Sequence, residues 1–271
     1  MSQQDKATAF HALHTGPVLV LPNAWDAASA RLVEHAGARA VATTSAGLSW
    51  SLGRPDGGRL DRATALAALS RITGAVDVPV TADIEGGYGE DLAETVALVL
   101  GTGAVGVNVE DSADGRLLDV RTHAERVATI RRAAEAFGVD LFVNARIDVY
   151  FFGDATVSDT LRRAEAYTAA GADGVFVPGV ADPETIAQLV ENLDAPLNVL
   201  AGAGSPTVAE LAALGVARVS VGQGLAEAAY SAAHRSAVEL LTAGTYAVGG
   251  EMDYSTLNRL LATRAATPDL G

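Results

Sequence analysis

The sequence has no cysteine among its 271 residues, and its only lysine is Lys6. Without cysteine, disulfides, thiolate catalysis and zinc–thiolate sites are excluded. A Schiff-base aldolase or a pyridoxal enzyme requires a buried active-site lysine. Lys6 precedes the first strand pattern and is badly placed for that role. The sequence therefore argues against covalent catalysis through sulfur or an amine.

Long apolar runs and clusters of positive charge are also missing. No apolar stretch reaches the ~18 residues that cross a bilayer. No apolar segment follows a basic start within Met1–Phe10, so no secretory signal is predicted. The formal net charge is −14, whereas nucleic-acid binding requires a basic surface. We therefore expect a cytoplasmic protein that binds neither a membrane nor nucleic acid.

Eight short, Val-rich apolar runs alternate with segments of helical periodicity. The runs are nearly continuous, which is typical of strands buried on both faces of a parallel sheet. Strands that alternate with helices indicate βαβ units, and a closed (β/α)8 barrel commonly uses about 250 residues as one domain. The runs are Pro17–Asn23, Ala38–Ser45, Pro79–Glu85, Gly106–Asp111, Leu141–Asp148, Gly174–Pro178, Leu197–Ala201 and Arg218–Gly222.

A glycine repeat supports the barrel. Gly37, Gly103, Gly171 and Gly215 each follow a helical segment, where a left-handed residue is favoured. Their spacings are near multiples of about 22 residues, which is the length of one barrel unit. An open doubly wound sheet is the alternative, but no GxGxxG motif follows the first run. We predict a single α/β TIM-barrel domain over residues 1–271, with additional C-terminal helices from about residue 225.

Several runs end in polar residues. Functional side chains of such barrels lie where the strands end, and burying an unpaired carboxylate there is costly. We assign Asn198, near the end of the seventh run, to substrate binding. The five histidines precede the first run or lie on helical segments, where packing or surface roles are expected. The other polar strand ends are Asn23, Asp26, Ser45, Asp83, Glu85, Glu110, Asp111, Arg146 and Asp148.

The acidic strand ends predict a metal site. Asp83 and Glu85 are two residues apart, so a regular strand places them on the same face, and Glu110 comes from the neighbouring strand. Three converging carboxylates repel each other unless a cation lies between them. Oxygen-only ligands favour Mg²⁺ or Mn²⁺. The alternative is an ion-pair network with Arg146, unless Arg146 instead binds a substrate carboxylate with both arms of its guanidinium.

Two glycine-containing loops follow the second and third runs. Ser45, Ala46 and Gly47 form a small, flexible segment that can direct backbone N–H groups at a carboxylate or phosphate, although a plain turn is the simpler interpretation. The segment Gly86–Gly89 lets the chain turn closely past the predicted metal site.

The order and spacing of these motifs resemble the isocitrate lyase/phosphoenolpyruvate mutase superfamily over roughly residues 15 to 225. The matching segments are Pro22–Ala30, Thr44–Gly47, Gly53–Asp56, Ala82–Gly89, Val109–Asp111 and Ala145–Asp148. The resemblance implies a barrel that binds Mg²⁺ and a small 2-oxo or 2-hydroxy carboxylate. Such enzymes make or break a C–C or P–C bond next to an enolate.

The resemblance also implies residue roles. Asp56, Asp83, Glu85 and Glu110 match the metal-site carboxylates of the family, several of which act through metal-bound water. Ser45, Ala46 and Gly47 match the loop whose backbone holds the substrate carboxylate. Arg146 matches the arginine that contacts the substrate. We accordingly expect Arg146, Asp56 and Glu110 to be catalytic, and Asp83 to contact both metal and substrate.

Family members often exchange a C-terminal helix between subunits and form tetramers. The apolar helix after Leu225 fits such an exchange, so the resemblance implies a homotetramer arranged as a dimer of dimers.

One loop departs from the family. After Glu110-Asp111, isocitrate and methylisocitrate lyases carry Lys-Lys-Cys-Gly-His on a gating loop, and the phosphonomutase branch carries Lys-Thr-Asn-Ser. This sequence has neither in Ser112–Leu118. Our first hypothesis remains a Mg²⁺-dependent lyase that cleaves a C–C bond of an oxaloacetate-like or methylisocitrate-like compound. The alternatives are a P–C bond mutase or hydrolase, and a barrel that binds a 2-oxo acid without turnover. The reach of Asp114 and Arg116 discriminates the last of these.

Overall fold

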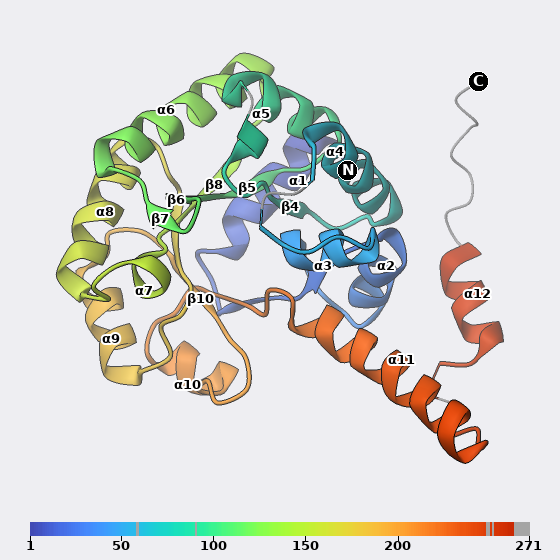
Figure 1. Ribbon diagram of the computed structural model, residues 1–271. Coiled ribbons are helices and arrows are strands. Elements are labelled where there is room, and N and C mark those ends of the chain that lie inside the picture. The colour runs from blue at the N-terminus through green and yellow to red at the C-terminus, as the bar shows by residue number, and fades with distance from the viewer. Residues whose placement is uncertain (58–59, 90, 248–249, 251, 263–271) are drawn as a thin grey trace.

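The computed structural model of the protein describes residues 1–57, 60–89, 91–247, 250 and 252–262. Within this part of the chain, nine β segments form one parallel sheet, and helices surround it in a ring (Figure 1). The segments are β1 (Leu19–Leu21), β2 (Asn23–Ala24), β3 (Val41–Thr43), β4 (Val80–Asp83), β5 (Gly106–Glu110), β8 (Phe142–Arg146), β9 (Gly174–Val177), β10 (Leu197–Leu200) and β11 (Arg218–Ser220).

The sheet closes on itself at Pro22. β1 pairs with β11 and β2 pairs with β3, and only Pro22 separates β1 from β2 along the chain. Proline has no N–H to donate to a strand ladder, so it divides one strand into two segments. Each of the eight predicted runs therefore contains one barrel strand, and the (β/α)8 fold is confirmed. The predicted runs extend one to three residues beyond most of the strands.

Most helices lie outside the barrel, but the loops at its C-terminal end carry extra elements. Helix α3 follows β3, a 3-10 turn (Gly87–Gly89) follows β4, the hairpin β6 (Ser112–Ala113) and β7 (Arg116–Leu117) follows β5, and α7 follows β8. The helices are α1 (Gln3–Leu13), α2 (Ala27–His35), α3 (Ser45–Ser51), α4 (Arg62–Ala75), α5 (Leu92–Gly101), α6 (Val120–Phe137), α7 (Val149–Phe152), α8 (Val157–Ala169), α9 (Pro183–Asn192), α10 (Val208–Ala213), α11 (Gly224–Ala243) and α12 (Tyr254–Ala262).

Local sequence signals set where the outer helices begin and end. Asp26, Asp61 and Asp91 accept hydrogen bonds from backbone N–H groups in the first turns of α2, α4 and α5. Each bond satisfies a donor that the start of a helix leaves free. The repeated glycines all have positive φ, at 99°, 95°, 108° and 90°, as the sequence predicted for Gly37, Gly103, Gly171 and Gly215.

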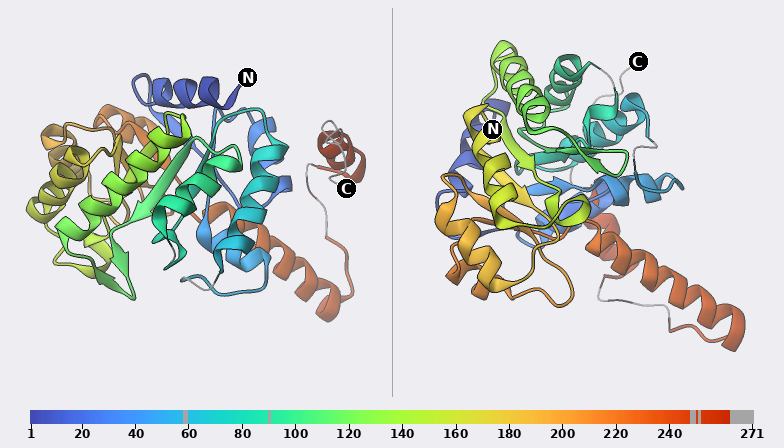
Figure 2. Two further views of the ribbon diagram at one scale, coloured as in Figure 1. Left: turned by 90° about the horizontal axis from the view of Figure 1, so that it is seen from above. Right: turned by 60° about the vertical axis from the view of Figure 1, so that its left-hand side comes forward.

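Helix α1 covers the N-terminal end of the barrel, as the left view of Figure 2 shows. Phe10 lies against Gly106, the first residue of β5, where any side chain would collide with its ring. His14 stacks on Phe142, the first residue of β8, with ring centroids 3.9 Å apart. Ligands can therefore enter only from the opposite end, where the strands terminate.

The interior of the barrel contains polar side chains as well as aliphatic ones. Asn144 donates a hydrogen bond to Asn108 Oδ1 at 2.9 Å, and Arg218 donates to the same oxygen at 3.3 Å. Arg218 is fully buried, and burial lowers its pKa to about 9 although Asp83 favours its charged form. A buried positive charge therefore lies inside the barrel, close enough to Asp83 to stabilise that carboxylate.

The buried His123 on α6 is expected to lower the free energy of unfolding as the pH falls. It is completely buried, and neither ring nitrogen has a hydrogen-bond partner among the described residues. Burial, then the charges of Arg126 and Arg163, lower its pKa to about 3. The unfolded chain binds a proton there near pH 6.5 and the folded chain does not, so stability is lost as the pH falls from 6.5 towards 3.

We expect His123→Leu to remove this contribution, which amounts to at most about 1.4 kcal/mol per pH unit. Urea denaturation between pH 4 and 7 measures it. The exposed His35→Gln serves as the control and should keep the wild-type slope. An unchanged slope in His123→Leu would show that His123 is already protonated in the folded protein.

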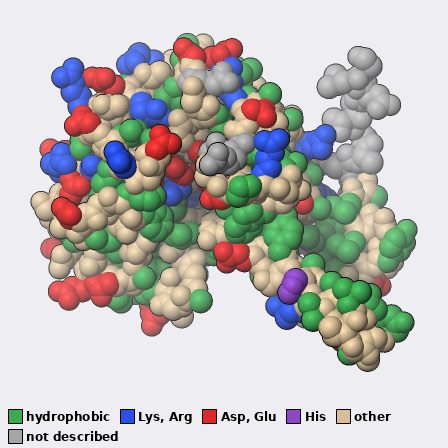
Figure 3. All heavy atoms as spheres, viewed as in Figure 1, with side chains coloured by type: hydrophobic (Ala, Val, Ile, Leu, Met, Phe, Trp, Pro, Cys, Tyr) green, Lys and Arg blue, Asp and Glu red, His purple; other side chains and the backbone are tan. Residues whose placement is uncertain are grey.

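Helix α11 projects away from the barrel, and Ala226 is its only buried residue (Figure 1). Figure 3 shows hydrophobic side chains along this helix. Helix α12 lies near α2, where Arg31 donates a hydrogen bond to the carbonyl of Leu260 at 3.1 Å. In the described part of the chain, no helix has the length and apolar character needed to cross a membrane.

Candidate active site

A pocket of about 260 Å³ opens among the C-terminal ends of the strands. The strand ends, the loops that follow them and the helices α3 and α7 supply its walls. Its lining residues are Asn23, Thr43, Thr44, Ser45, Ala46, Trp50, Asp56, Asp83, Asn108, Arg146, Phe151, Phe176, Pro178, Leu200, Ser220, Gly222 and Gln223. Five residues that the sequence assigned to the site thus face one cavity: Ser45, Ala46, Asp56, Asp83 and Arg146.

Arg146 ends β8 and is held by two carboxylates. Its Nη1 donates to Glu110 Oε1 at 2.5 Å, and its Nε donates to Asp148 Oδ1 at 2.7 Å. Burial disfavours the guanidinium charge, but Glu110 and Asp148 outweigh burial and raise the pKa of Arg146. The ion-pair network considered from the sequence therefore exists. It fixes Arg146 at the pocket and uses two of its three nitrogens.

Asp83 and Glu85 do not continue one strand. Strand β4 ends at Asp83, and Glu85 lies in a turn with a φ of 49°. The expectation that both carboxylates leave a regular strand on the same face was wrong, because the backbone adopts a positive φ at Glu85 and turns there, with Gly87 N donating to the carbonyl of Ile84. The Asp83 carboxylate accepts hydrogen bonds from Ser45 N at 3.3 Å and Glu85 N at 3.2 Å. Arg126 anchors the turn by donating to the carbonyl of Gly86 at 2.5 Å.

Glu110 ends β5, beside these carboxylates, although it does not line the pocket. Burial raises its pKa to about 8, against the opposing charge of Arg146. The negative charges of Asp83, Asp148 and Glu85 raise it further. Negative charge at this end of the barrel therefore exceeds what Arg146 neutralises.

The residues present fit a hard divalent cation by their chemistry. The neighbouring donors are carboxylate oxygens, and the negative charges that add to the effect of burial on the pKa of Glu110 are charges that a cation would counter. Among the described residues, however, no three His, Asp or Glu side chains converge into a group that could hold a metal ion. Mg²⁺ commonly keeps several waters and needs only one or two protein carboxylates, so the donor set remains suitable for it.

The segment that begins at Ser45 is helical and not the flexible loop expected from its small residues. Thr44 caps α3 by accepting a hydrogen bond from Gly47 N at 3.5 Å. Ser45 and Ala46 face the pocket from the first turn. Gly47 does not line the pocket. It packs against Trp25, whose Cβ would lie 2.9 Å from any Cβ at position 47.

Two further residues that the sequence assigned to the site, Asp56 and Asn198, differ from each other in where they lie. Asp56 is exposed on the loop after α3 and lines the pocket. Asn198 is the second residue of β10 and lies inside the barrel, where its Oδ1 accepts a hydrogen bond from Ser220 at 3.2 Å. The residue of β10 that reaches the pocket is Leu200. The sequence missed Asn108, although its position two residues before Glu110 on the same strand could have indicated it.

A buried hydrogen-bond network fixes the chain just beyond the C-terminal ends of β5 and β8. Asp111 accepts hydrogen bonds from Asp148 N at 2.8 Å, Arg163 Nη1 at 3.0 Å and Tyr167 Oη at 2.9 Å. Ser112 on hairpin β6–β7 donates to Asp148 Oδ2 at 2.5 Å. The β6–β7 hairpin is thus tied to the residue that orients Arg146.

The hairpin supplies no visible catalytic group. Asp114 and Arg116 are both exposed and neither lines the pocket. The sequence analysis used the reach of these two side chains to separate a lyase from a barrel that binds a 2-oxo acid without turnover. Their positions outside the pocket favour the barrel without turnover.

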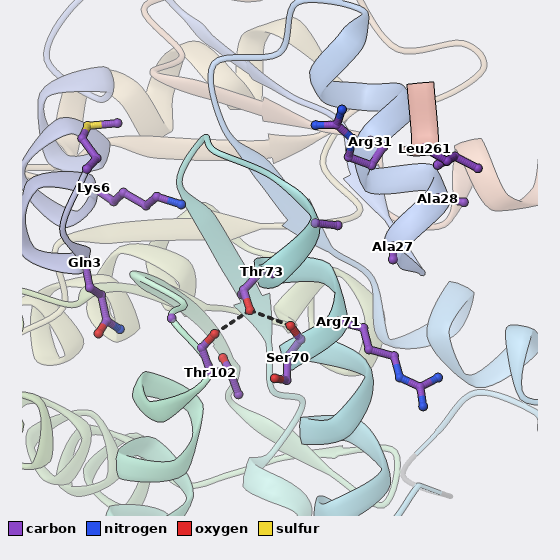
Figure 4. Close-up of a pocket in the computed structure, with 14 residues that line it drawn as sticks. Gln3, Lys6, Ala27, Ala28, Arg31, Ser70, Arg71, Thr73, Thr102 and Leu261 are labelled. Carbon is purple, nitrogen blue, oxygen red and sulfur yellow. Dashed lines mark hydrogen bonds between the residues drawn. The ribbon is translucent and has the colours of Figure 1, made fainter. Parts of the chain in front are cut away.

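A larger hollow of about 850 Å³ lies elsewhere, among α1, α2, α4 and α12 (Figure 4). It contains Lys6, whose Nζ donates to the carbonyl of Val76 at 3.4 Å. Thr73 in its wall donates to the carbonyls of Thr102 and Ser70. None of the strand-end residues lines this hollow. It is a groove between helices and is separate from the pocket at the C-terminal ends of the strands.

A family model described as phosphoenolpyruvate phosphomutase matches residues 10–241 of the chain. The chain belongs to the isocitrate lyase/phosphoenolpyruvate mutase superfamily. The resemblance carried by the strand-end motifs is thereby confirmed. The match covers every barrel strand and most of α11.

Relatives within this superfamily differ in activity. A solved structure of a Burkholderia cenocepacia protein, described as a candidate lyase/mutase, has a TM-score of 0.89 and 39% identity, covering 96% of each chain. A 2-methylisocitrate lyase of Bacillus subtilis is 29% identical and covers 72% of this chain and 67% of its own. An oxaloacetate decarboxylase of Pseudomonas savastanoi is 29% identical, over 94% and 90%. Membership in the superfamily therefore leaves the substrate open.

Proposed function

We propose that this protein is a Mg²⁺-dependent lyase that cleaves a C–C bond of a small 2-oxo or 2-hydroxy carboxylate. The observation that carries the proposal is Arg146, held by Glu110 and Asp148 in the same pocket as Asp83. This places a fixed positive charge opposite an acidic centre, as an anionic chelating substrate requires. The named activities of the Bacillus and Pseudomonas relatives support the same substrate class.

Of Asp83, Glu85 and Glu110, one or two would hold the cation, since these side chains do not converge into a single group of three. Mg²⁺, or Mn²⁺ in its place, would stabilise the negative charge that develops on the 2-oxo oxygen when the bond breaks. Ser45 and Ala46 line the pocket, and we assign their backbone N–H groups to the substrate carboxylate, which would replace Asp83 as the acceptor for Ser45 N. With Gly47 and Asn198 outside the lining, their predicted substrate contacts remain proposals.

The protein groups supply charge stabilisation and proton transfer. Arg146 donates to the oxygen on C2 as that oxygen gains negative charge. Asp56 makes no hydrogen bond or ion pair with the residues that the structure describes, and it lines the pocket, so its carboxyl group is placed to exchange a proton with the ligand. Cleavage of a 2-hydroxy acid transfers the hydroxyl proton to a base, and the carbanion left on C3 takes up a proton.

Two alternatives rest on specific observations. The family model is named for a phosphomutase, which favours a P–C bond enzyme of the mutase or phosphonopyruvate hydrolase type. The absence of Asp114 and Arg116 from the pocket lining favours a barrel that binds a 2-oxo acid without turnover. We further propose a cytoplasmic homotetramer in which the apolar surface of α11 is covered by another subunit.

The proposal predicts metal-dependent binding of oxalate, which has the planar shape and charge of an enolate of pyruvate. At a hundredfold excess over its dissociation constant, a ligand adds about 2.7 kcal/mol to stability. We expect oxalate to raise the Tm by several degrees with Mg²⁺ present, and EDTA to abolish the shift. An equal shift in EDTA would exclude a metal-dependent site.

A further inference from the structure

A buried arginine contacts one of the pocket residues from inside the barrel. Arg218 is the first residue of β11, is 1% exposed and does not line the pocket. Its Nη2 donates to Asn108 Oδ1 at 3.3 Å, while its Nε and Nη1 have no partner among the described residues. Burying a charge with so few hydrogen bonds costs stability, and such exceptions are expected where a residue serves a site.

The side chain that accepts this hydrogen bond lines the pocket. Asn108 is the third residue of β5, and its Oδ1 also accepts from Asn144 Nδ2 at 2.9 Å. A guanidinium has donors only, so the amide atom that faces Arg218 must be the oxygen. The amide nitrogen, Nδ2, lies at the other corner of the same planar group and therefore faces away from Arg218.

Asn108 Nδ2 is a free hydrogen-bond donor. It donates to no residue in the part of the chain that the structure describes, and it is not among the polar atoms that are buried without a partner. Asp83 lies opposite Asn108 in the register of β4 and β5, but its carboxylate accepts from Ser45 N and Glu85 N. The accessible nitrogen of Asn108 is therefore available to a ligand in the pocket.

The contact with Arg218 strengthens this donor. A hydrogen bond to the amide oxygen polarises the amide and increases the positive partial charge on its N–H groups. Asn108 Oδ1 receives two such bonds, one of them from a charged group. The positive charge of Arg218 thus acts on the pocket through a neutral donor, which suits an anionic oxygen and does not suit a metal cation.

We propose that Asn108 binds an anionic oxygen of the ligand through Nδ2, and that Arg218 is a positioning residue that holds the amide in this orientation. This inference rests on the proposed function for the nature of the ligand, a metal-chelating 2-oxo or 2-hydroxy carboxylate. It adds a contact from β5 to the one that Arg146 makes from the adjacent β8. It also excludes the oxygen of Asn108 from the ligands of the cation, because that oxygen faces the barrel interior.

Asn108→Asp tests the direction of the amide. The new carboxylate keeps the shape and still accepts from Arg218 and Asn144, but it presents an oxygen where Nδ2 donated. In calorimetric titration with oxalate and Mg²⁺, we expect affinity to fall by about tenfold or more, the loss typical of a hydrogen bond to a charged group. Exposed Asn192→Asp on α9 is the matched control and should bind like the wild type. Equal or tighter binding by Asn108→Asp would overturn the inference.

Asn108→Ala removes the donor without adding a negative charge. We expect a loss of oxalate affinity of the same order, about tenfold or more. The loss in Asn108→Asp then cannot come from charge repulsion alone. Wild-type affinity in Asn108→Ala would show that Nδ2 does not contact the ligand.

Two substitutions of Arg218 test its positioning role. Arg218→Met fills similar space, and replacing a buried charge by an apolar side chain often leaves stability unchanged. We expect it to weaken oxalate binding by about tenfold, as the loss of an orienting group does, because the amide of Asn108 can then turn over. Arg218→Lys keeps a donor-only cation and should recover most of that affinity. Equal losses in both variants would show that Arg218 supports the barrel and does not orient Asn108.

A double variant separates positioning from a direct effect of charge. If Arg218 acts through Asn108, Arg218→Met causes no further loss of oxalate affinity in an Asn108→Ala background. Additive losses would overturn the positioning role.

The wild type separates this inference from the proposed function. If oxalate binds the wild type only with Mg²⁺ and binds Asn108→Asp equally well, the proposed function stands and the inference is wrong. If the wild type does not bind oxalate with Mg²⁺, both fall.

Discussion

Replacing Glu110 by glutamine is expected to weaken the Mg²⁺-dependent binding of oxalate by about 100-fold or more. The change removes one negative charge from the acidic end of the barrel and keeps the side-chain shape. In the wild type, Arg146 Nη1 donates to Glu110 Oε1 at 2.5 Å, and in the variant the neutral amide oxygen of glutamine can accept this hydrogen bond. The proposed cation would lose a ligand, and the ligand's own chelation cannot replace it.

Calorimetric titration with oxalate, with and without Mg²⁺, measures this effect. Glu125→Gln is the matched control, because Glu125 pairs with Arg121 on the exposed surface of α6 and does not line the pocket. It should bind oxalate like the wild type. Wild-type affinity in Glu110→Gln would remove Glu110 from the metal site.

Arg146→Lys is expected to reduce oxalate affinity by about 30-fold, equivalent to about 2 kcal/mol. A lysine keeps the charge but presents one ammonium group, which cannot contact Glu110, Asp148 and a ligand in the fixed geometry of a guanidinium. Asp148 would lose the hydrogen bond that Arg146 Nε now donates at 2.7 Å. The variant therefore tests orientation separately from charge.

The same titration measures this variant, and Arg121→Lys on the surface of α6 is its control. The side chain of Arg121 is 88% exposed, so that substitution should leave affinity unchanged. If Arg146→Lys binds oxalate like the wild type, Arg146 holds the fold together and does not recognise the ligand.

The barrel could be predicted because its signals are local and repeated. Strands buried on both faces give continuous apolar runs, and each unit ends at a glycine that adopts a left-handed conformation, as Gly103 and Gly171 do. The break at Pro22 was not predicted, since a proline inside a run does not reveal that the two halves pair with opposite neighbours.

The candidate site was predictable in its composition but not in its geometry. Strand ends identified Asp83, Glu110 and Arg146, and the structure places these residues near one another. The left-handed turn at Glu85 depends on contacts with distant residues such as Arg126, which no local pattern reveals. Helix α3 was missed because seven residues are too few to show a helical period.

The apolar residues that line the pocket could not be read from the sequence for a different reason. Phe176 is the third residue of β9 and Leu200 ends β10, so both lie in apolar runs and carry the same pattern as core residues. Only the barrel geometry turns these side chains towards the pocket that contains Arg146. The sequence therefore identified the reacting end of the pocket and left its specificity undetermined.

The most direct test of the central claim is the release of a 2-oxo acid by the purified protein in the presence of Mg²⁺. The substrates are oxaloacetate, isocitrate, methylisocitrate and phosphonopyruvate, each with an EDTA control. We expect EDTA-sensitive release of pyruvate or glyoxylate from a substrate with a scissile C–C bond. Release from phosphonopyruvate alone, or no release from any substrate while oxalate still binds with Mg²⁺, would contradict it.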